Sequence, residues 1–238
     1  MRANNRTQQQ LRNITFEPHY IDHPEGSCLI RMGKTWVLCT ATIEERVPPF
    51  LDGKGQGWIT AEYSMLPRAT HSRTQREAVK GKQTGRTQEI QRLIGRSLRA
   101  CLDLQKLGER TITIDCDVLQ ADGGTRIASI NGGFVALYLS IQKLLKNKKL
   151  QENPITDTVS AVSVGMKNNE VLVDLDYQED SSCDVDMNIV MLGSERIVEV
   201  QGTGENNTFT FQQMSQMMEE AKLATNFIAK LQKKTTNP

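Results

Sequence analysis

No apolar run in the chain of 238 residues approaches the roughly 18 residues that a membrane-spanning helix needs, so we predict no membrane contact. The first ten residues, MRANNRTQQQ, are polar and contain no apolar segment, and we therefore do not expect a secretion signal. Neither sign of charge is in excess, because 29 basic and 28 acidic residues leave a net charge of +1. With 38% apolar residues, this balance makes a disordered chain unexpected and is a weak argument against non-specific coating of nucleic acid.

Cysteine is scarce and scattered along the chain. The five cysteines are an odd number and include no C-x-x-C pair, so the sequence indicates neither a structural zinc site nor a disulfide framework. We expect all five to be small, buried apolar residues: Cys28, Cys39, Cys101, Cys116 and Cys183. A reducing, cytoplasmic location fits this pattern.

The apolar residues are patterned for short strands and three long helices. Alternation and β-branched runs predict strands at residues 28–32, 35–43, 58–63, 111–118, 159–166, 171–175, 185–192 and 196–201. Apolar spacings of three and four predict helices at about 90–102, at about 125–145 and after Thr210, which Gln213 helps to cap. We expect Phe227 on the buried apolar stripe of the last of these helices. This order indicates an α+β domain with mixed sheets, not a doubly wound parallel sheet. No long linker is present, so we predict a single domain over residues 1–238.

The pentapeptide Asp122-Gly123-Gly124-Thr125-Arg126 joins a predicted strand to a predicted helix. Helix N-termini bind anions through unpaired N–H groups, and glycines let the backbone approach an anion closely. Thr125 adds a hydroxyl donor and Arg126 a planar guanidinium that suits phosphate oxygens. Taken alone, however, the pentapeptide fits an ordinary tight turn better, because short loops that contain glycine are common.

Residues 66–86 contain six basic side chains and only one acidic side chain, Glu77, which leaves a local charge of +5. The basic residues are Arg68, Arg73, Arg76, Lys80, Lys82 and Arg86. A solvated loop usually explains such a run, but four arginines against two lysines slightly favour contacts with a polyanion.

Six carboxylates gather within thirteen residues: Asp174, Asp176, Glu179, Asp180, Asp184 and Asp186. Asp184 and Asp186 lie two residues apart at the start of a predicted strand, so both side chains can face the same side. Such a pair can hold Mg²⁺ or act as a general acid. From spacing alone, a solvated acidic turn is an equally good interpretation.

A basic segment, an anion-binding helix start and clustered carboxylates together fit phosphoryl transfer on a nucleic acid. When an inorganic phosphate approaches a phosphodiester, each pair of unit charges at ~4 Å costs on the order of 4 kcal/mol at an effective dielectric constant of about 20. Arginines and a metal ion must offset this repulsion. A hydrolytic nuclease uses water and needs no second anion site, so the extra site favours phosphorolysis.

Three long strings resemble the ribonuclease PH family: GWITAEYSMLPRAT at 57–70, GRTQEIQRLIGRSLR at 85–99 and DCDVLQADGGTR at 115–126. The similarity extends from about Arg12 to the C-terminal helix. It implies the ribosomal protein S5 domain 2-like fold, an α+β fold in which mixed sheets pack with helices. It also implies phosphorolytic 3′→5′ trimming of tRNA precursors and of other structured RNAs such as rRNA. Inorganic phosphate would be the co-substrate, nucleoside 5′-diphosphates the products, and a homohexamer, built as a trimer of dimers, the assembly.

The resemblance also implies roles for individual residues. It implies that phosphate is bound by Arg86, Gly124, Thr125 and Arg126. It implies that Asp180 and Asp186 are the catalytic carboxylates and Mg²⁺ ligands, in place of the pair that spacing suggested. RNA contacts are implied for Arg68, Arg73, Arg76 and Arg92, and ring assembly is the alternative role of the first three. Asn188 stands where the related phosphorylases have a lysine, although asparagine is usual in this family.

Two other functions remain open from the sequence. One is a non-catalytic RNA-binding ring subunit of an exosome-like assembly, and the other is a Mg²⁺-dependent hydrolytic exonuclease. Non-catalytic relatives tend to lose the phosphate-binding arginines or the acidic pair, whereas this chain has all of them.

Overall fold

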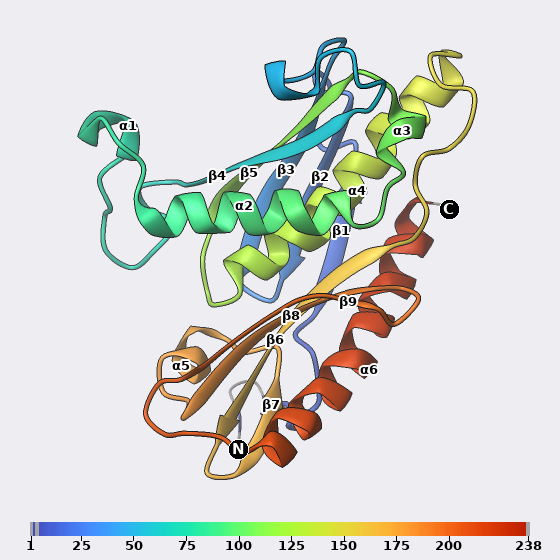
Figure 1. Cartoon of the computed structure of the whole chain (residues 1–238). Helices are drawn as coiled ribbons and strands as arrows, with labels where there is room; N and C mark the ends of the chain where they lie inside the picture. The colour runs from blue at the N-terminus through green and yellow to red at the C-terminus, as the bar shows by residue number, and fades with distance from the viewer. Residues whose placement is uncertain (1, 3–4, 237–238) are drawn as a thin grey trace.

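A computed structural model describes residue 2 and residues 5–236, which form two β-sheets with helices between them (Figure 1). The first sheet has the strand order β1-β2-β3-β5-β4, and its neighbouring strands are antiparallel except for the parallel pair β4 and β5. Its strands are β1 (Ile14–Pro18), β2 (Gly26–Met32), β3 (Thr35–Glu44), β4 (Trp58–Met65) and β5 (Thr111–Gln120).

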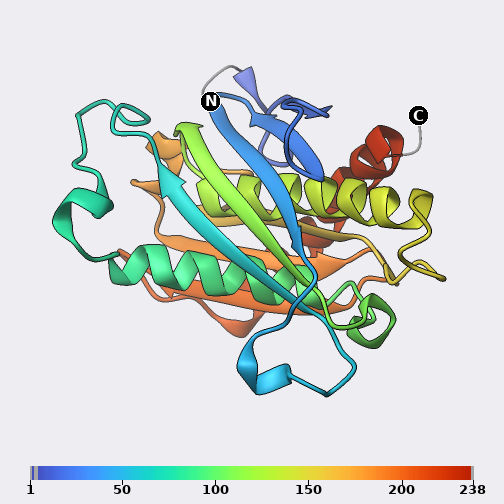
Figure 2. The ribbon, with the colours of Figure 1, turned by 90° about the horizontal axis from the view of Figure 1, so that it is seen from above.

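The second sheet is antiparallel, with the strand order β7-β6-β8-β9. Its strands are β6 (Val159–Lys167), β7 (Glu170–Val173), β8 (Val185–Leu192) and β9 (Ile197–Gly204). The long helices are α2 (Gly85–Arg99), α4 (Thr125–Lys146) and α6 (Phe211–Thr236). Figure 2 shows α2 and α4 side by side under the first sheet, and α4 also contacts β6 of the second sheet. None of the helices in the described part of the chain has the length and hydropathy of a membrane span.

Small residues bring α4 close to the first sheet. A Cβ atom on Gly132 would lie 2.7 Å from Ile30 Cγ2 and 2.8 Å from Cys39 Sγ, so only glycine permits this approach. As a result α4 is buried on nearly all sides, and one apolar cluster includes residues from both sheets. The N-terminus of α4 is thereby fixed between the sheets, at the end of the turn that follows β5.

The predicted α+β class with mixed sheets is confirmed, and so is each predicted strand and long helix to within a few residues. The capping pair is also confirmed, because the Thr210 N–H donates to Gln213 Oε1 (2.8 Å) and the Gln213 N–H donates to Thr210 Oγ1 (3.2 Å). All five cysteines are free and buried, as expected. β1 and the short helices α1 (Glu77–Lys80), α3 (Leu104–Leu107) and α5 (Tyr177–Asp180), together with a 3-10 helix at Pro49–Leu51, were not predicted.

Three predicted details are wrong, each for a local reason. Helix α2 begins at Gly85, earlier than its apolar period, because Thr84 caps it and accepts the Thr87 N–H (3.3 Å). Strand β7 ends at Val173 because Asp174 adopts the left-handed conformation, with φ of 57°. Phe227 was expected on the buried stripe of α6, but its side chain is 52% exposed.

We propose that residues 1–238 fold as one domain, because the apolar cluster is continuous from the first sheet to the second. Chemical unfolding should then give a single transition. Tryptophan fluorescence reports on the first sheet, which contains Trp36 and Trp58, and far-ultraviolet circular dichroism reports on the whole chain. Coincident midpoints are expected, and two separated transitions would mean that the sheets unfold independently.

Candidate functional site

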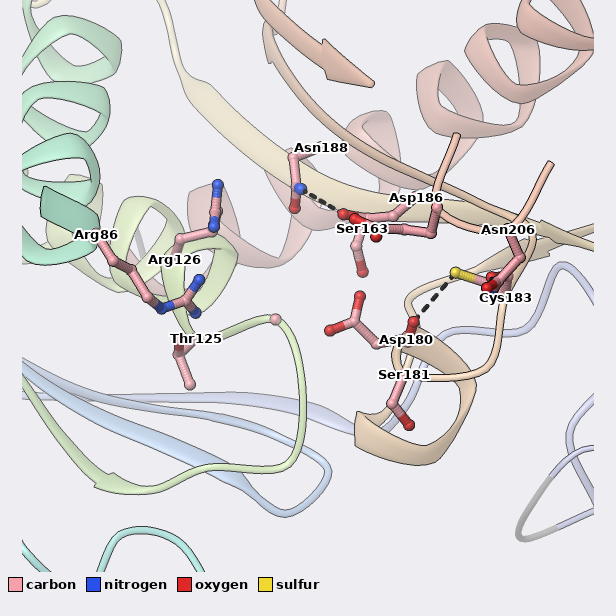
Figure 3. Close-up of a pocket in the computed structure, with 12 residues that line it drawn as sticks. Arg86, Thr125, Arg126, Ser163, Asp180, Ser181, Cys183, Asp186, Asn188 and Asn206 are labelled. Carbon is pink, nitrogen blue, oxygen red and sulfur yellow. Dashed lines mark hydrogen bonds between the residues drawn. The ribbon is translucent and has the colours of Figure 1, made fainter. Parts of the chain in front are cut away.

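A pocket of about 410 Å³ opens between the N-terminal ends of α2 and α4 on one side and the second sheet on the other. The six residues for which the resemblance implies phosphate binding or catalysis all line it: Arg86, Gly124, Thr125, Arg126, Asp180 and Asp186. Figure 3 shows the two arginines and Thr125 on one side of the pocket and the two carboxylates facing them. Elements that are distant in sequence thus place positive and negative groups opposite each other.

The turn before α4 requires glycine at two positions. Gly123 and Gly124 have φ of 75° and 66°, in the left-handed region that other residues rarely adopt. A Cβ atom on Gly123 would lie 2.7 Å from the carbonyl carbon of Asp176 and 2.8 Å from the Tyr177 nitrogen. The turn therefore packs directly on the segment that begins α5, and it presents the free N–H groups of the α4 N-terminus to the pocket.

The hydroxyl of Thr125 is held by a buried phenol. Tyr63, on β4, places its hydroxyl 2.8 Å from Thr125 Oγ1. Burial raises the pKa of Tyr63, so the phenol keeps its proton at neutral pH and can donate it to Thr125. Either hydroxyl can donate in this bond, and when Tyr63 donates, the Thr125 hydroxyl has its own proton available for an anion in the pocket.

The two arginines of the pocket differ in how they are held. Arg126 donates from Nη1 to Gln201 Oε1 (2.9 Å), and the same nitrogen lies 3.4 Å from Glu89 Oε1. Arg86, in the first turn of α2, is exposed, and its guanidinium makes no hydrogen bond or ion pair with the described residues. Arg86 therefore keeps its donors free for an incoming anion.

The carboxylate side consists of Asp180, at the end of α5, and Asp186, on β8. Asp186 Oδ2 accepts a hydrogen bond from Asn188 Nδ2 (3.3 Å), while its Oδ1 is buried and has no hydrogen-bond partner among the described residues. Burial, followed by repulsion from Asp180, raises the pKa of Asp186 to about 6. Burial also raises the pKa of Asp180, although Arg126 and Arg86 act in the opposite direction.

These two carboxylates fit a divalent cation. Mg²⁺ keeps several waters and takes one or two protein carboxylates together with substrate phosphates. The unpartnered Oδ1 of Asp186 is a buried acceptor that such a cation would satisfy. The described residues contain no cluster of three or more His, Cys, Asp or Glu side chains that could hold a metal by themselves. Asp180 and Asp186 therefore suit an ion that substrate helps to bind.

The pairing of Asp184 with Asp186 is wrong. Asp184 precedes the first residue of β8, so the alternation of a strand does not apply to it. Its Oδ2 accepts the Asn168 N–H (3.1 Å) in the turn between β6 and β7, and the residue does not line the pocket. The sequence spacing of two was therefore misleading.

Half of the acidic cluster is also unavailable to a metal. Three arginines near the N-terminus bind it: Arg2 pairs with Glu179 at 2.7 Å, Arg6 with Glu179 at 2.9 Å and Arg12 with Asp174 at 2.6 Å. Asp176 lies 3.8 Å from Arg6 Nη2 and also caps α5, accepting the Glu179 N–H at 2.9 Å. These carboxylates hold the segment before Asp180 in place.

The arginines for which RNA contact was implied lie outside the pocket. Arg68, Arg73 and Arg76 are exposed in the segment between β4 and α2, and Arg92 is exposed on α2. The structure does not bring them together with the six pocket residues, and their role in RNA binding stays a prediction.

Sequence reasoning missed several residues of the pocket. The pocket is also lined by Ser163, Ser181, Glu205 and Asn206. Tyr63 lies behind the lining and holds Thr125 through the hydrogen bond between their hydroxyls. Glu205 comes close because its N–H donates to the Asp184 carbonyl (3.0 Å), where the end of β9 lies beside the start of β8. No local sequence pattern predicts this contact, because it depends on which strands pair in the sheet.

Comparisons with known proteins agree with this geometry. Models of the 3′ exoribonuclease family match residues 10–141 as its domain 1 and residues 157–224 as its domain 2. The chain is 58% identical to ribonuclease PH of Bacillus pumilus, over 99% of this chain and 98% of that one. It is 60% identical to ribonuclease PH of Bacillus subtilis, over 92% and 89% of the two chains.

Solved structures support the fold. The rice protein Rrp46 superposes with a TM-score of 0.80 at 17% identity, over 99% of this chain and 100% of that one. An exosome chain of Archaeoglobus fulgidus, solved with RNA bound to the active site, gives 0.80 at 21% identity over 98% and 92% of the two chains. The fold is the S5 domain 2-like fold that the sequence resemblance implied.

Replacing Asp186 with asparagine should stabilise the protein when no divalent cation is present. The pKa of Asp186 is about 6 in the folded chain against an ordinary 3.8, so its ionisation penalises folding above pH 6. This difference in pKa corresponds to about 3 kcal/mol, and we expect Asp186→Asn to recover roughly 2 kcal/mol at pH 8 in EDTA.

The gain should stay nearly full down to pH 6 and shrink to a small remainder at pH 4, because the unfolded chain, with an ordinary pKa of 3.8, becomes protonated at this position only below that pH. Urea unfolding at pH 8, 6 and 4 measures it. Asp184→Asn is the matched control, because that side chain lies outside the pocket. Equal or lower stability of Asp186→Asn at pH 8 would show that the carboxylate is not penalised by burial.

Proposed function

The chain belongs to the ribonuclease PH family of 3′ exoribonucleases, and from this premise we propose how the pocket performs the reaction of the family. The chain is a phosphorolytic 3′→5′ exoribonuclease that trims tRNA precursors. Inorganic phosphate is the nucleophile, and each cycle releases one nucleoside 5′-diphosphate. The single observation that supports our assignment of the site is the pocket in which Arg86, Thr125 and Arg126 face two carboxylates.

The arginine side binds the attacking phosphate. Arg86 and Arg126 supply charged donors, Thr125 supplies its hydroxyl proton, and the backbone of Gly124 supplies an N–H group at the α4 N-terminus. These groups offset the negative charge of the phosphate and hold one of its oxygens toward the last phosphodiester of the RNA. In-line attack then forms the new bond to phosphorus and releases the 3′ oxygen of the shortened RNA.

The carboxylate side serves the group that leaves. We assign the position near the leaving 3′ oxygen to Asp186, because this carboxyl faces the phosphate-binding side across the pocket, and burial raises its pKa in the direction that favours holding a proton. Asp180 and Asp186 would also hold Mg²⁺, which supplies positive charge to the transferring phosphoryl group when bound. Asn188 keeps Asp186 oriented through its hydrogen bond to Oδ2.

Replacing Arg126 with alanine should raise the phosphate concentration needed for half-maximal rate by about tenfold or more, since a charge-assisted donor to the phosphate is lost. Binding of the tRNA precursor should change little. The assay incubates a tRNA with extra 3′ nucleotides at a series of phosphate concentrations, and the products are identified by chromatography.

The control is Arg46→Ala, which removes an exposed arginine that pairs with Glu44 at the end of β3 and does not line the pocket. An unchanged phosphate requirement in Arg126→Ala would remove this residue from the phosphate site. In the wild type, diphosphates that form only with phosphate support phosphorolysis, whereas monophosphates would favour the hydrolytic exonuclease. Absence of products would favour the non-catalytic ring subunit.

We further propose that the chain assembles as a homohexamer, a trimer of dimers, in the cytoplasm. Large apolar side chains exposed on β9 and α6, namely Ile197, Phe211, Leu223 and Phe227, support burial between subunits.

The five free cysteines suit a reducing compartment. Native mass spectrometry should give six times the mass of the 26.7 kDa chain, and cell fractionation should recover it with cytoplasmic proteins. A monomeric mass would contradict the assembly, and recovery outside the cytoplasm would contradict the location.

A further inference from the structure

Arg12 is a buried charged residue that has no part in the mechanism above, yet its contacts reach both sides of the pocket. It lies just before β1 and is 7% exposed. One edge of its guanidinium binds Asp174, with Nε 3.0 Å from Oδ2 and Nη2 2.6 Å from Oδ1. The Arg12 N–H also donates to Asp174 Oδ2, at 2.8 Å. Asp174 is fully buried, so Arg12 supplies the positive charge that this carboxylate needs.

The other edge of the guanidinium holds the turn that precedes α4. Arg12 Nη1 donates to the Asp122 carbonyl at 2.6 Å and lies 3.4 Å from the Gly123 carbonyl. The hydroxyl of Thr35 completes this support, because it donates to the Gly123 carbonyl (2.6 Å) and accepts the Asp122 N–H (2.9 Å). Both carbonyl groups of the turn therefore point toward Arg12 and Thr35.

This arrangement fixes the direction of the N–H groups in the turn. In a trans peptide the N–H and the C=O point in opposite directions. Holding the carbonyls of Asp122 and Gly123 thus turns the N–H groups of Gly123 and Gly124 away from Arg12, and Gly124 lines the pocket. Neither Arg12 nor Thr35 lines the pocket. Both act on it only through their hydrogen bonds to the backbone of the turn.

On the carboxylate side of the pocket, Asp174 is connected to the catalytic carboxylates by hydrogen bonds and by the chain itself. Its N–H donates to the Ser163 carbonyl (2.7 Å), and the Leu175 N–H donates to Ser163 Oγ (3.1 Å). Ser163 itself lines the pocket. Asp180 follows six residues after Asp174, at the end of α5. One guanidinium therefore connects the turn on the phosphate side with the segment that places a carboxylate.

We propose that Arg12 is a positioning residue for phosphorolysis, which orients the backbone donors at the α4 N-terminus toward the phosphate that binds there. This inference rests on the proposed function of the pocket. A backbone N–H that points away from the bound anion no longer donates to it, so a residue that orients this N–H affects phosphate binding without touching substrate.

The test separates positioning from a contribution to stability alone. Arg12→Lys keeps the positive charge beside Asp174 and loses the planar fork that reaches the turn. We expect the KM for inorganic phosphate to rise about tenfold, while the KM for the tRNA precursor and kcat at saturating phosphate stay within about threefold. Calorimetric titration of the protein with inorganic phosphate should show the same loss of affinity.

Thr35 offers a second variant that leaves the Arg12–Asp174 pair intact. Thr35→Val removes both hydrogen bonds of the hydroxyl to the turn and should raise the KM for phosphate about threefold, whereas Thr35→Ser should restore it. Arg99→Lys is the matched control. Arg99 is a half-buried arginine that donates to the Ile59 carbonyl (2.7 Å), and it lies thirteen residues from Arg86, roughly 20 Å along α2.

Two results would overturn the inference. One is a folded Arg12→Lys protein with lowered kcat and an unchanged KM for phosphate, since loss of stability alone reduces only the amount of active protein. The other is an unchanged KM for inorganic phosphate in the Thr35→Val protein. This second result decides the test if Arg12→Lys does not fold. Failure of the proposed function is distinguishable, because the wild type would then release no nucleoside diphosphates when phosphate is supplied.

Discussion

Repulsion between an inorganic phosphate and the phosphodiester that it attacks is the constraint on which the site depends. At ~4 Å and an effective dielectric constant of about 20, each pair of unit charges costs on the order of 4 kcal/mol. The charged groups of the pocket are arranged asymmetrically, which reduces this repulsion. Arg86, Arg126 and the N-terminus of α4 supply positive charge to the nucleophile on one side, while Asp180 and Asp186 face them from the other. A cation between substrate and carboxylates completes the compensation.

The asymmetry follows from the two-sheet architecture. The arginine side belongs to helices that pack under the first sheet, whereas the carboxylates belong to the second sheet and to α5. Distances across the pocket are therefore set by how firmly the two parts are joined. The continuous apolar cluster joins them broadly, and Arg12 joins them locally through Asp174 and the glycine turn. Among the described residues, Asp186 Oδ1 has no hydrogen-bond partner although it is buried. This lowers the stability of the fold locally and leaves an acceptor free for substrate or a cation.

The sequence predicted the elements well where one physical pattern decides them. Apolar periodicity located the long helices and strands, and the six residues named from the resemblance all line one pocket, while their roles stay predictions. Spacing failed for Asp184, because the residue precedes the strand, and it could not separate Asp180 from carboxylates that arginines neutralise. Tyr63, Glu205 and Arg12 were not found, since their contacts depend on strand pairing and on packing between segments distant in sequence.

A crystal structure of the protein soaked with orthophosphate, without RNA, tests the central claim most directly. The account predicts a phosphate ion within hydrogen-bonding distance of the Arg86 and Arg126 guanidiniums and the Thr125 hydroxyl, with Asp180 and Asp186 on the opposite side of the pocket. A pocket without phosphate at millimolar concentrations of the anion, or a phosphate bound elsewhere while Arg86 and Arg126 point apart, would contradict it.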